Sequence, residues 1–227
     1  MYRRPDDRLC SALPYLKRGG RIADVGTDHA YLPVYLVGSG HSSFAVASDL
    51  RKGPLERAER NVQEAGLSDK ISLVLCDGLS KIEPYRPDDI LIFGMGGELI
   101  ASILDAAPWV KNSESGLILQ PMSRQETLRR YLLEQGFSIL GESLTFVDRI
   151  YQTIYARYTG ESEQYTDEEL LLGRLNLQNK PPLLRPLIER EIHILGDVIE
   201  GKRCARAANT ARDEGLLSAL QLRLEEL

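Results

Sequence analysis

The sequence predicts an α/β protein in which a mostly parallel sheet, closed by an antiparallel hairpin, precedes an α-helical, coiled-coil-like appendage. Three observations support this fold class. Short apolar runs alternate with helical segments up to residue 135, two β-like runs follow each other directly over residues 138–158, and everything beyond residue 159 is helical in composition. We therefore expect two domains, residues 1–159 and 160–227, which a chain of 227 residues can accommodate.

The alternating part begins with an amphipathic segment, predicted as a helix over residues 6–16. Five apolar runs then have the length and composition of buried strands, over residues 21–25, 44–49, 71–76, 90–93 and 116–119. Helical segments occupy the intervals, over residues 29–37, 54–65, 99–106 and 124–135. Strands separated in this way by helices predict βαβ units, and hence a parallel sheet with helices on both faces.

The sheet is expected to end in an antiparallel hairpin. Residues 138–146 and 150–158 both have the pattern of strands, and only Val147, Asp148 and Arg149 separate them. A connection this short joins antiparallel neighbours, because parallel strands require a crossover of a dozen or more residues. The hairpin therefore closes the predicted sheet at one edge.

Two apolar seams indicate that the C-terminal part is a helical hairpin. One series of apolar residues, with alternating spacings of three and four, begins at Leu184, and a second leucine series begins at Leu216. Two long helices packed antiparallel would bury both seams. Pro181-Pro182 is expected to mark the start of the first helix, and Gly215 a break.

The composition indicates an ordinary globular protein in a reducing compartment. The chain is 43% hydrophobic and 27% charged. Its three cysteines are scattered without a CxxC pair, which fits a cytoplasmic location and gives no support for a metal site or a disulfide framework. Residues 1–7 lack an apolar leader, and Glu98 and Asp105 interrupt the most apolar segment, so we expect neither a secretory signal nor a membrane span.

The charge distribution neither indicates nor excludes a nucleic-acid partner. The net charge of −5 is unfavourable for binding phosphates. Residues 201–212, however, contain Lys202, Arg203 and Arg206 and no acid. From charge alone, the simpler interpretation of this stretch is a solvated surface.

The most informative segment is residues 22–33, Ile-Ala-Asp-Val-Gly-Thr-Asp-His-Ala-Tyr-Leu-Pro. A strand that ends in a tight glycine turn before a helix opens many nucleotide-binding units, because the backbone approaches the ligand there and the helix N-terminus offers free N–H groups. A dinucleotide fingerprint starting at Gly26 needs glycine at positions 28 and 31, where this chain has Asp28 and Tyr31. A carboxylate would repel a pyrophosphate, but it would not repel the ammonium or sulfonium of S-adenosylmethionine.

Acidic residues follow the next two strands and would face the same crevice. Asp49, followed by Leu50, lies 25 residues after Asp24, near the offset at which an acidic side chain binds ribose hydroxyls. Asp77 could accept a hydrogen bond from an adenine amine, and Gly78 would let the ring lie against the backbone. The alternatives are a helix cap for Asp49 and a plain Asp-Gly turn for the other pair.

The segment Gly94-Met95-Gly96-Gly97 follows the fourth predicted strand. Three glycines in four positions are costly in conformational entropy, so we expect unusual dihedral angles or close backbone contact with a ligand. The alternative is a tight strand-to-helix turn. Gln120-Pro121, after the fifth strand, could add an amide to the same pocket.

Four motifs together resemble the bacterial tRNA (adenine(22)-N(1))-methyltransferases: Asp24-Val-Gly-Thr-Asp-His-Ala-Tyr-Leu-Pro33, Cys76-Asp-Gly-Leu79, Gly94-Met-Gly-Gly97 and Leu119-Gln-Pro121. The resemblance runs through residues 1–158 and extends to the helical appendage. It implies a Rossmann-like class I methyltransferase fold, S-adenosylmethionine as the methyl donor without a metal, and N1 of adenine 22 of tRNA as the acceptor. The Asn/Asp-Pro-Pro-aromatic motif of enzymes that methylate the adenine amino group is absent after the fourth strand.

The motifs and the resemblance together assign roles to individual residues. Those expected to bind S-adenosylmethionine are Asp24, Gly26, Asp28, His29, Asp49, Leu50, Asp77, Gly78, Gly94, Met95 and Gly96. Those expected to contact the RNA are Gly97, Gln120, Pro121, Lys202, Arg203 and Arg206. Because adenine N1 already has a lone pair, we expect catalysis from positioning, from Asp28 beside the developing positive ring, and from Tyr31 as a stacking or hydrogen-bonding partner.

Other functions stay open at this point. A class I methyltransferase could act on another RNA, a small molecule or a protein, and a non-catalytic protein could work through the helical appendage. A dinucleotide oxidoreductase is disfavoured by the glycine spacing. His29 could simply begin a helix and Tyr31 could belong to the core, and the sequence does not distinguish a monomer from a weak oligomer.

Overall fold

The computed structural model describes residues 4–205 and 210–227, and the chain divides into two compact units, residues 1–163 and 164–227. The predicted boundary after residue 159 falls in the irregular segment between the last strand and the first helix of the second unit. Among the described residues, no helix combines the length and the apolar composition that crossing a membrane requires.

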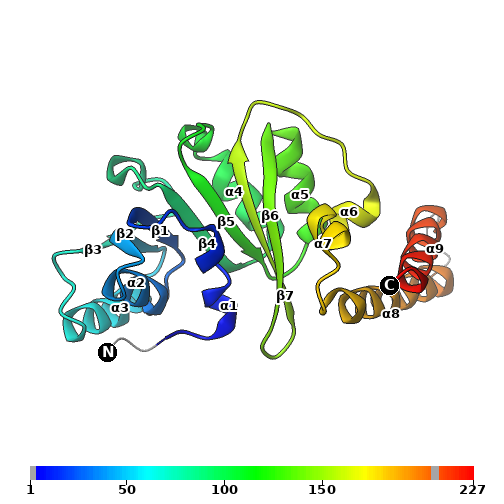
Figure 1. Ribbon diagram of the computed structural model, residues 1–227, viewed down its shortest axis with the longest axis horizontal. Helices are drawn as coiled ribbons and strands as arrows, with labels where there is room; N and C mark the ends of the chain where they lie inside the picture. The colour runs from blue at the N-terminus through cyan, green and yellow to red at the C-terminus, as the bar shows by residue number, and fades with distance from the viewer. Residues whose placement is uncertain (1–3, 206–209) are drawn as a thin grey trace. The chain divides into compact units, whose positions relative to one another are not determined.

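The first unit is built on one mixed sheet whose strands, in the described part of the chain, lie in the order β3-β2-β1-β4-β5-β7-β6 (Figure 1). Their bounds are β1 Gly20–Val25, β2 Ser42–Asp49, β3 Ile71–Leu75, β4 Asp89–Met95, β5 Gly116–Pro121, β6 Phe137–Phe146 and β7 Ile150–Tyr158. The strands β1 to β5 pair in parallel, whereas β7 is antiparallel to both β5 and β6. The predicted parallel sheet with a terminal hairpin is confirmed.

The strand order reverses between β1 and β4, and this reversal positions the site. From β1 the chain moves outward through β2 to β3, and it then returns to β4 and continues to β5 in the opposite direction. Because parallel crossovers are right-handed, α2 (Tyr31–Gly38) and α3 (Lys52–Glu64) lie on one face of the sheet and α4 (Gly97–Asp105) on the other. The connections therefore diverge at the carboxyl ends of β1 and β4 and leave a crevice, where ligands bind in such folds.

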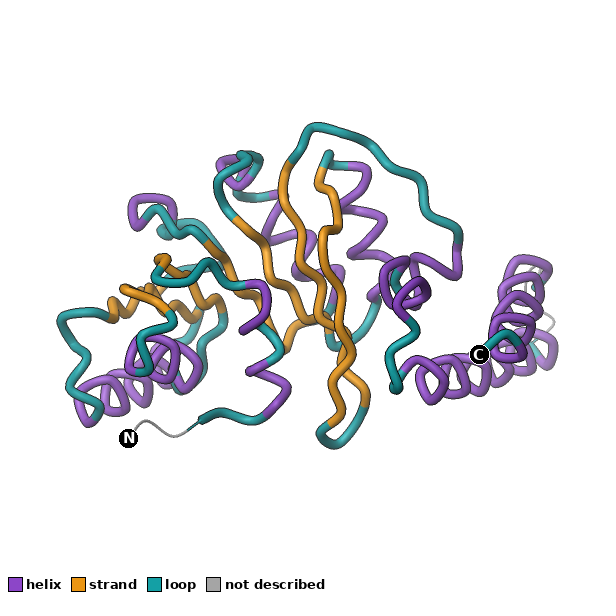
Figure 2. Tube along the Cα trace, in the orientation of Figure 1, coloured by secondary structure: helices purple, strands orange, loops and turns teal. Residues whose placement is uncertain are grey.

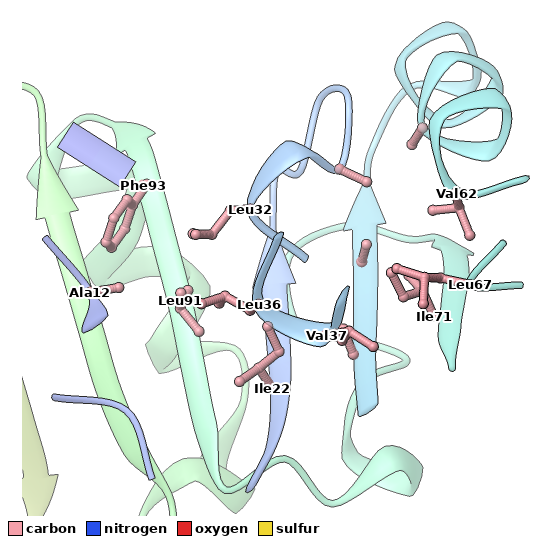
Figure 3. Close-up of a cluster of buried hydrophobic side chains, with 14 of the residues drawn as sticks. Ala12, Ile22, Leu32, Leu36, Val37, Val62, Leu67, Ile71, Leu91 and Phe93 are labelled. Atoms are coloured by element: carbon pink, nitrogen blue, oxygen red, sulfur yellow. The ribbon is translucent and has the colours of Figure 1, made fainter. Parts of the chain in front are cut away.

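Apolar side chains from strands and helices fill the space between the sheet and its α2–α3 face (Figure 3). Leu36 of α2 points toward Ile22 of β1 and Leu91 of β4, and all three side chains are fully buried. On the opposite face, α5 (Gln125–Glu134) buries Arg129, whose Nε donates to Glu142 at 2.7 Å. That ion pair satisfies a charge which would otherwise be very costly to bury.

The predicted N-terminal helix over residues 6–16 is wrong as a continuous element. The helix α1 covers only Asp7–Cys10, and a separate 3-10 helix covers Leu13–Tyr15. Pro14 explains the interruption, because proline has no N–H to donate and clashes with the preceding helical turn. Asp6 begins α1 by accepting a hydrogen bond of 2.9 Å from Leu9 N.

The second unit consists of helices in the residues that the structure describes. Their bounds are α6 Asp167–Leu172, α7 Arg174–Asn179, α8 Leu184–Cys204 and α9 Ala211–Glu225. Lys202 near the end of α8 lies 2.5 Å from Asp213 at the start of α9, and Arg185 at the start of α8 donates to Leu224 O at 3.3 Å near the end of α9. The two long helices are therefore antiparallel, and the predicted helical hairpin is confirmed.

Of the two helix boundaries predicted in the second unit, one is confirmed and one is wrong. The helix α8 begins at Leu184, two residues after Pro182, as the double proline predicts. Gly215 does not break the second helix, because it lies inside α9. One glycine in a helix interior costs about 1 kcal/mol, and burying a side chain such as Leu220 offsets that cost.

Candidate active site

Two adjoining cavities open at the carboxyl edge of the sheet. The first, which we call the α4-side cavity, has a volume of about 300 Å³. Its lining includes Val25, Gly26, Asp28, Asp49, Leu50, Arg51, Asp77, Gly78, Phe93, Gly94, Met95, Leu99 and Ile103. It gathers the ends of β1, β2, β3 and β4 around one hollow, as the strand-order reversal predicts.

The second hollow, which we call the α1-side cavity, has a volume of about 420 Å³. It is lined by Asp6, Arg8, Leu9, Asp24, Gly26, Thr27, Asp28, His29, Tyr31, Leu32, Phe93 and Gly94. The two cavities share Gly26, Asp28, Phe93 and Gly94. The first glycine turn and the end of β4 therefore lie where the two cavities meet.

Gly26 makes the turn that separates the cavities. Its φ of +77° lies in the left-handed region, and an added Cβ would come within 2.4 Å of the Met95 side chain. The turn is held by two backbone hydrogen bonds to Ser48 O, from Gly26 N at 2.8 Å and from Thr27 N at 2.9 Å. Glycine is needed here both for the dihedral angle and for the space.

Asp24, beneath this turn, is a buried carboxylate with a raised pKa. Only 7% of the residue is exposed, and the loss of solvent raises its pKa to about 6. The negative charge of Asp49 raises the pKa further, whereas the hydrogen bond from Thr27 Oγ1 and the positive charge of Arg8 lower it. At neutral pH the group is largely ionised, so a cation placed beside it would be stabilised.

Asp28 is exposed at the boundary of both cavities and adopts a left-handed backbone conformation with φ of +50°. Its carboxylate lies 3.3 Å from Arg57 Nη2 and 3.3 Å from His29 Nε2. Ala30 is also left-handed, with φ of +56°, so α2 starts at Tyr31 and not at the predicted residue 29. His29 therefore lies in the turn before the helix and does not begin it.

His29 and Tyr31 form a stacked aromatic pair on the wall of the α1-side cavity. Their ring centroids are 5.2 Å apart and the ring planes differ by 16°. Tyr31 is 56% exposed, so it is not a core residue, and Asn61 Nδ2 fixes the His29 backbone by donating to its carbonyl at 2.8 Å. The pair presents a flat surface on which a base can stack.

Asp49 holds a local turn and lines a cavity. Its Oδ1 accepts a hydrogen bond of 2.9 Å from the backbone N of Arg51, the residue before α3, so Asp49 does not cap that helix as the alternative supposed. The same carboxylate lines the α4-side cavity next to the exposed Leu50. Because a carboxylate can accept several hydrogen bonds, the backbone contact leaves capacity for a diol.

Asp77 and Gly78 form the part of the α4-side cavity that follows β3. Asp77 O accepts a hydrogen bond of 3.1 Å from Ser80 N, so the pair also makes a turn. Gly78 has φ of +50°, and an added Cβ would lie 3.0 Å from Ile103. Asp77 is exposed and Ile103 is buried, which gives this end of the cavity one polar and one apolar wall.

The Gly-Met-Gly-Gly segment is a tight strand-to-helix turn, because β4 runs to Met95 and α4 starts at Gly97. Gly94, with φ of +77°, and Met95 line the α4-side cavity. Gly96 and Gly97 line neither cavity. An added Cβ at Gly97 would lie 2.2 Å from Arg124 O, so this glycine lets α4 pack against the chain before α5.

Gln120 and Pro121 are buried in β5 and line neither cavity. Gln120 Nε2 donates to Arg8 O at 3.0 Å and to Thr153 Oγ1 at 3.0 Å. Its amide thus holds the α1 segment, which carries Arg8 and Leu9 into the α1-side cavity. The predicted contact of Gln120 and Pro121 with RNA stays a prediction.

Two of the three basic residues predicted to contact RNA in the second unit are paired with acids. Lys202 lies 2.5 Å from Asp213, and Arg203 lies 2.8 Å from Glu214. Arg206 lies outside the described residues. The role of these cations in RNA binding stays a prediction, and the ion pairs reduce the charge that they offer.

Comparisons with known proteins identify the family. A family model described as a methyltransferase domain matches residues 6–154. The tRNA (adenine(22)-N(1))-methyltransferase of Bacillus subtilis (strain 168) is 31% identical over 225 residues, which cover 97% of this chain and 94% of the relative. The chain belongs to this methyltransferase family.

Solved structures agree with the assignment. The crystal structure of the B. subtilis m1A22 tRNA methyltransferase TrmK matches this methyltransferase with a TM-score of 0.80 and 30% identity, over 98% of this chain and 96% of that one. A putative tRNA (m1A22) methyltransferase of Streptococcus pneumoniae, crystallised with S-adenosyl-L-methionine, matches with a TM-score of 0.85 and 29% identity over 96% and 99%. The Rossmann-like class I fold is confirmed.

Three residues in or beside the cavities of the methyltransferase were not predicted. Thr27 bonds the buried Asp24, Arg8 reaches the α1-side cavity, and Arg57 pairs with Asp28. Thr27 stands inside the Asp-Val-Gly-Thr string, so its hydroxyl offered a local signal. Arg8 and Arg57 reach the site only through tertiary packing, and no local pattern marks them.

Proposed function

We propose that this methyltransferase transfers the methyl group of S-adenosylmethionine to N1 of adenine 22 of tRNA. The observation that carries the proposal is the pair of cavities that meet at Gly26 and Asp28, one suited to a nucleoside and the other to a cationic group and a flat base. The activity of the B. subtilis relative, and the S-adenosylmethionine bound in the S. pneumoniae structure, support the same reaction.

The residues of the α4-side cavity fit the nucleoside part of S-adenosylmethionine. Asp49, at the end of β2, has acceptor capacity for the two ribose hydroxyls. Asp77 provides an acceptor for the adenine amine, while Leu99 and Ile103 provide apolar surface for the ring. No pyrophosphate is required, so the carboxylate of Asp28 at the rim is compatible with this ligand.

Asp24 fits the amino-acid part of the same ligand. Its carboxylate is buried in the wall of the α1-side cavity, and it accepts a hydrogen bond from the neutral hydroxyl of Thr27. An ammonium group there would compensate the desolvated negative charge of this buried acid. When bound, S-adenosylmethionine supplies a methyl group on a positively charged sulfur, and the neutral thioether S-adenosylhomocysteine leaves when the methyl is transferred.

The α1-side cavity supplies what an adenine acceptor requires. The ring nitrogen N1 attacks with its own lone pair, so the protein needs to position the base and exclude water more than to remove a proton. The stacked rings of His29 and Tyr31 provide a surface for the base. The carboxylate of Asp28 stabilises the positive charge that develops on the adenine ring, with Arg57 and His29 holding it in place.

Two further assignments rest on the proposed reaction. Because tRNA substrates are found in the cytoplasm, the proposed reaction places the enzyme there. Lys202 and Arg203 would add phosphate contacts if their ion pairs rearrange when tRNA binds. A monomer or weak oligomer is compatible with a complete site in one chain. A class I methyltransferase acting on a small molecule or another RNA is the alternative.

Methyl transfer from isotopically labelled S-adenosylmethionine to an unmodified tRNA transcript tests the proposal. We expect label in the wild-type transcript and none in a transcript with guanine in place of adenine 22. Equal labelling of both transcripts would contradict the position, and labelling only of small molecules from a cell extract would contradict the substrate class.

A further inference from the structure

The guanidinium groups of two arginines lie beside the ring of Tyr151, at the start of β7. The Cζ atom of Arg149 lies 5.1 Å from the Tyr151 ring centroid, and the Cζ atom of Arg8 lies 5.6 Å from it. Both distances are within the range of cation–π attraction. The three residues come from two distant parts of the chain, α1 and the turn between β6 and β7, and we call them the Tyr151 cluster.

The Tyr151 cluster lies at the same edge of the sheet as the cavities. Leu119 of β5 pairs with Ile154 of β7, so Tyr151 lies beyond the last residue of β5 at its carboxyl end. The hairpin of β6 and β7 extends past the neighbouring strands at this edge, with α1 beside it (Figures 1 and 2). Arg8 also lines the α1-side cavity, so the cluster connects the cavity rim with the exposed hairpin turn.

The two guanidiniums keep their charge available. In the described part of the chain, neither Arg8 nor Arg149 lies within ion-pair distance of a carboxylate. The charge of Arg8 lowers the pKa of Asp24 through space, and the hydrogen bond from Tyr151 together with the charge of Arg149 lowers the pKa of Asp148. Asp148, the nearest acid in sequence to Arg149, accepts the hydroxyl of Tyr151 at 2.7 Å. Stacking on a ring orients a guanidinium without neutralising it, unlike an ion pair.

The second unit differs in this respect. Its cations Lys202, Arg203 and Arg212 each lie within 2.8 Å of an acidic oxygen. An anionic partner would have to displace those acids before it could bind there. At the Tyr151 cluster no such exchange is needed, so the electrostatic gain from a phosphate is larger.

We propose that Arg8 and Arg149, oriented by Tyr151, bind phosphates of the RNA strand that carries the target adenine. The inference rests on the proposed function, and it names a substrate-binding surface of the same site. A guanidinium fork matches a phosphate in a bidentate geometry, and phosphate contacts fix the register of a strand without reading its bases. Contacts beside the cavity would also offset the cost of unstacking the adenine.

Besides an RNA phosphate, Arg8 has a second possible anionic ligand, the carboxylate of the amino-acid part of S-adenosylmethionine. Arg8 and that carboxylate would both lie near the α1-side cavity. Arg149 lies on the exposed turn before β7. An RNA strand whose adenine enters the cavity would pass close to this turn. The two sources are separated by measuring the affinities for tRNA and for S-adenosylmethionine independently.

Arg149→Ala, Arg8→Ala and the control Arg18→Ala test the proposal in the full-length protein. Arg18 is an exposed arginine in the turn before β1, at the opposite edge of the sheet, and its loss changes the net charge equally. Binding of fluorescently labelled tRNA is measured by anisotropy at several salt concentrations without a methyl donor. Calorimetry gives the affinity for S-adenosylmethionine, and thermal melting checks the fold.

We expect Arg149→Ala and Arg8→Ala each to weaken tRNA binding about tenfold, the loss of one charge-assisted contact. The slope of log Kd against log salt concentration should become shallower by about one for each variant. Arg18→Ala should leave both quantities unchanged. Affinity for S-adenosylmethionine should be unchanged in Arg149→Ala.

The proposal would be overturned if Arg149→Ala and Arg8→Ala both bound tRNA with the same affinity and the same salt dependence as the wild type. Loss of S-adenosylmethionine affinity in Arg8→Ala without a loss of tRNA affinity would assign Arg8 to the methyl donor and overturn the shared phosphate site. If Arg8→Ala melts early, Arg149→Ala alone decides, because that side chain is exposed. A wild-type protein that shows the expected binding but methylates no tRNA would contradict the proposed function and leave this inference standing.

Discussion

Thr27 Oγ1 donates a hydrogen bond of 2.6 Å to Asp24 Oδ2 beneath the turn at Gly26. The donor is neutral, so it orients the buried carboxylate without cancelling its charge. The remaining charge is what makes the α1-side cavity suitable for an ammonium group. Because burial raises the pKa of Asp24 to about 6, that suitability depends on pH within an accessible range.

Affinity for S-adenosylmethionine should fall as the pH falls through 6. Asp24 gains a proton in that range and loses the charge that attracts the ammonium group. We expect the dissociation constant to rise about tenfold per pH unit below the pKa. Calorimetric titration from pH 5 to pH 8 measures this, and 5′-methylthioadenosine, which lacks the amino-acid part, is the matched control. An equal pH dependence for both ligands would assign the effect to another group.

Asp24→Asn should stabilise the unliganded protein at pH 8. Burial raises the folded-state pKa of Asp24 from the ordinary 3.8 to about 6, so this group's contribution to stability is fully present below pH 3.8 and is lost as the pH rises through about 6. At pH 8 the ionised group therefore costs at most about 3 kcal/mol. In urea unfolding, the Asp24→Asn variant should have a larger free energy of unfolding than the wild type at pH 8, and the difference should be smaller at pH 4. A less stable variant at pH 8 would show that the carboxylate has a stabilising partner.

Asp28→Asn should lower turnover while the backbone is kept. Asparagine tolerates the left-handed conformation at φ of +50°, so the loss is confined to the charge. We expect kcat on tRNA to fall roughly 10- to 100-fold, because the charge developing on the adenine loses its stabilising anion. Single-turnover kinetics at saturating S-adenosylmethionine and tRNA measure the step. Unchanged kcat would remove Asp28 from the mechanism.

Gly97→Ala should destabilise the first unit more than Gly96→Ala does. A Cβ at Gly97 would meet a backbone oxygen at 2.2 Å, whereas at Gly96 it would meet the Ser123 hydroxyl at 3.3 Å, and that side chain can rotate. We expect a loss of about 1–3 kcal/mol for Gly97→Ala, the usual cost of overpacking. Chemical denaturation of both variants measures the difference, and equal losses would contradict the packing role of Gly97.

The sheet was predictable because the inner parallel strands β1, β2, β4 and β5 are largely buried and appear in the sequence as short apolar runs. The amphipathic pattern of residues 6–16 predicts one helix, and only Pro14 signals its interruption. The helix α2 starts two residues after the predicted position, because a left-handed alanine at position 30 has no local signal.

The turns at Gly26 and Gly78 could be predicted from the sequence, because glycine there adopts a backbone conformation that the local motif itself signals. The role of Gln120 was not, because its partners Arg8 and Thr153 are 112 and 33 residues away in the sequence. Gly97 is predicted to contact the RNA, which stays a prediction, and in the structure its missing side chain also makes room for another segment of the protein. Spacing alone does not separate these two uses of glycine.

Mass spectrometry of tRNA after reaction tests the central claim most directly. Nuclease digestion of the methylated transcript locates the added mass, and comparison with standards distinguishes methylation at N1 from methylation at the exocyclic amine. We predict a single methyl group on N1 of adenine 22. A methyl group on another nucleotide, or on the amino group of that adenine, would contradict the account.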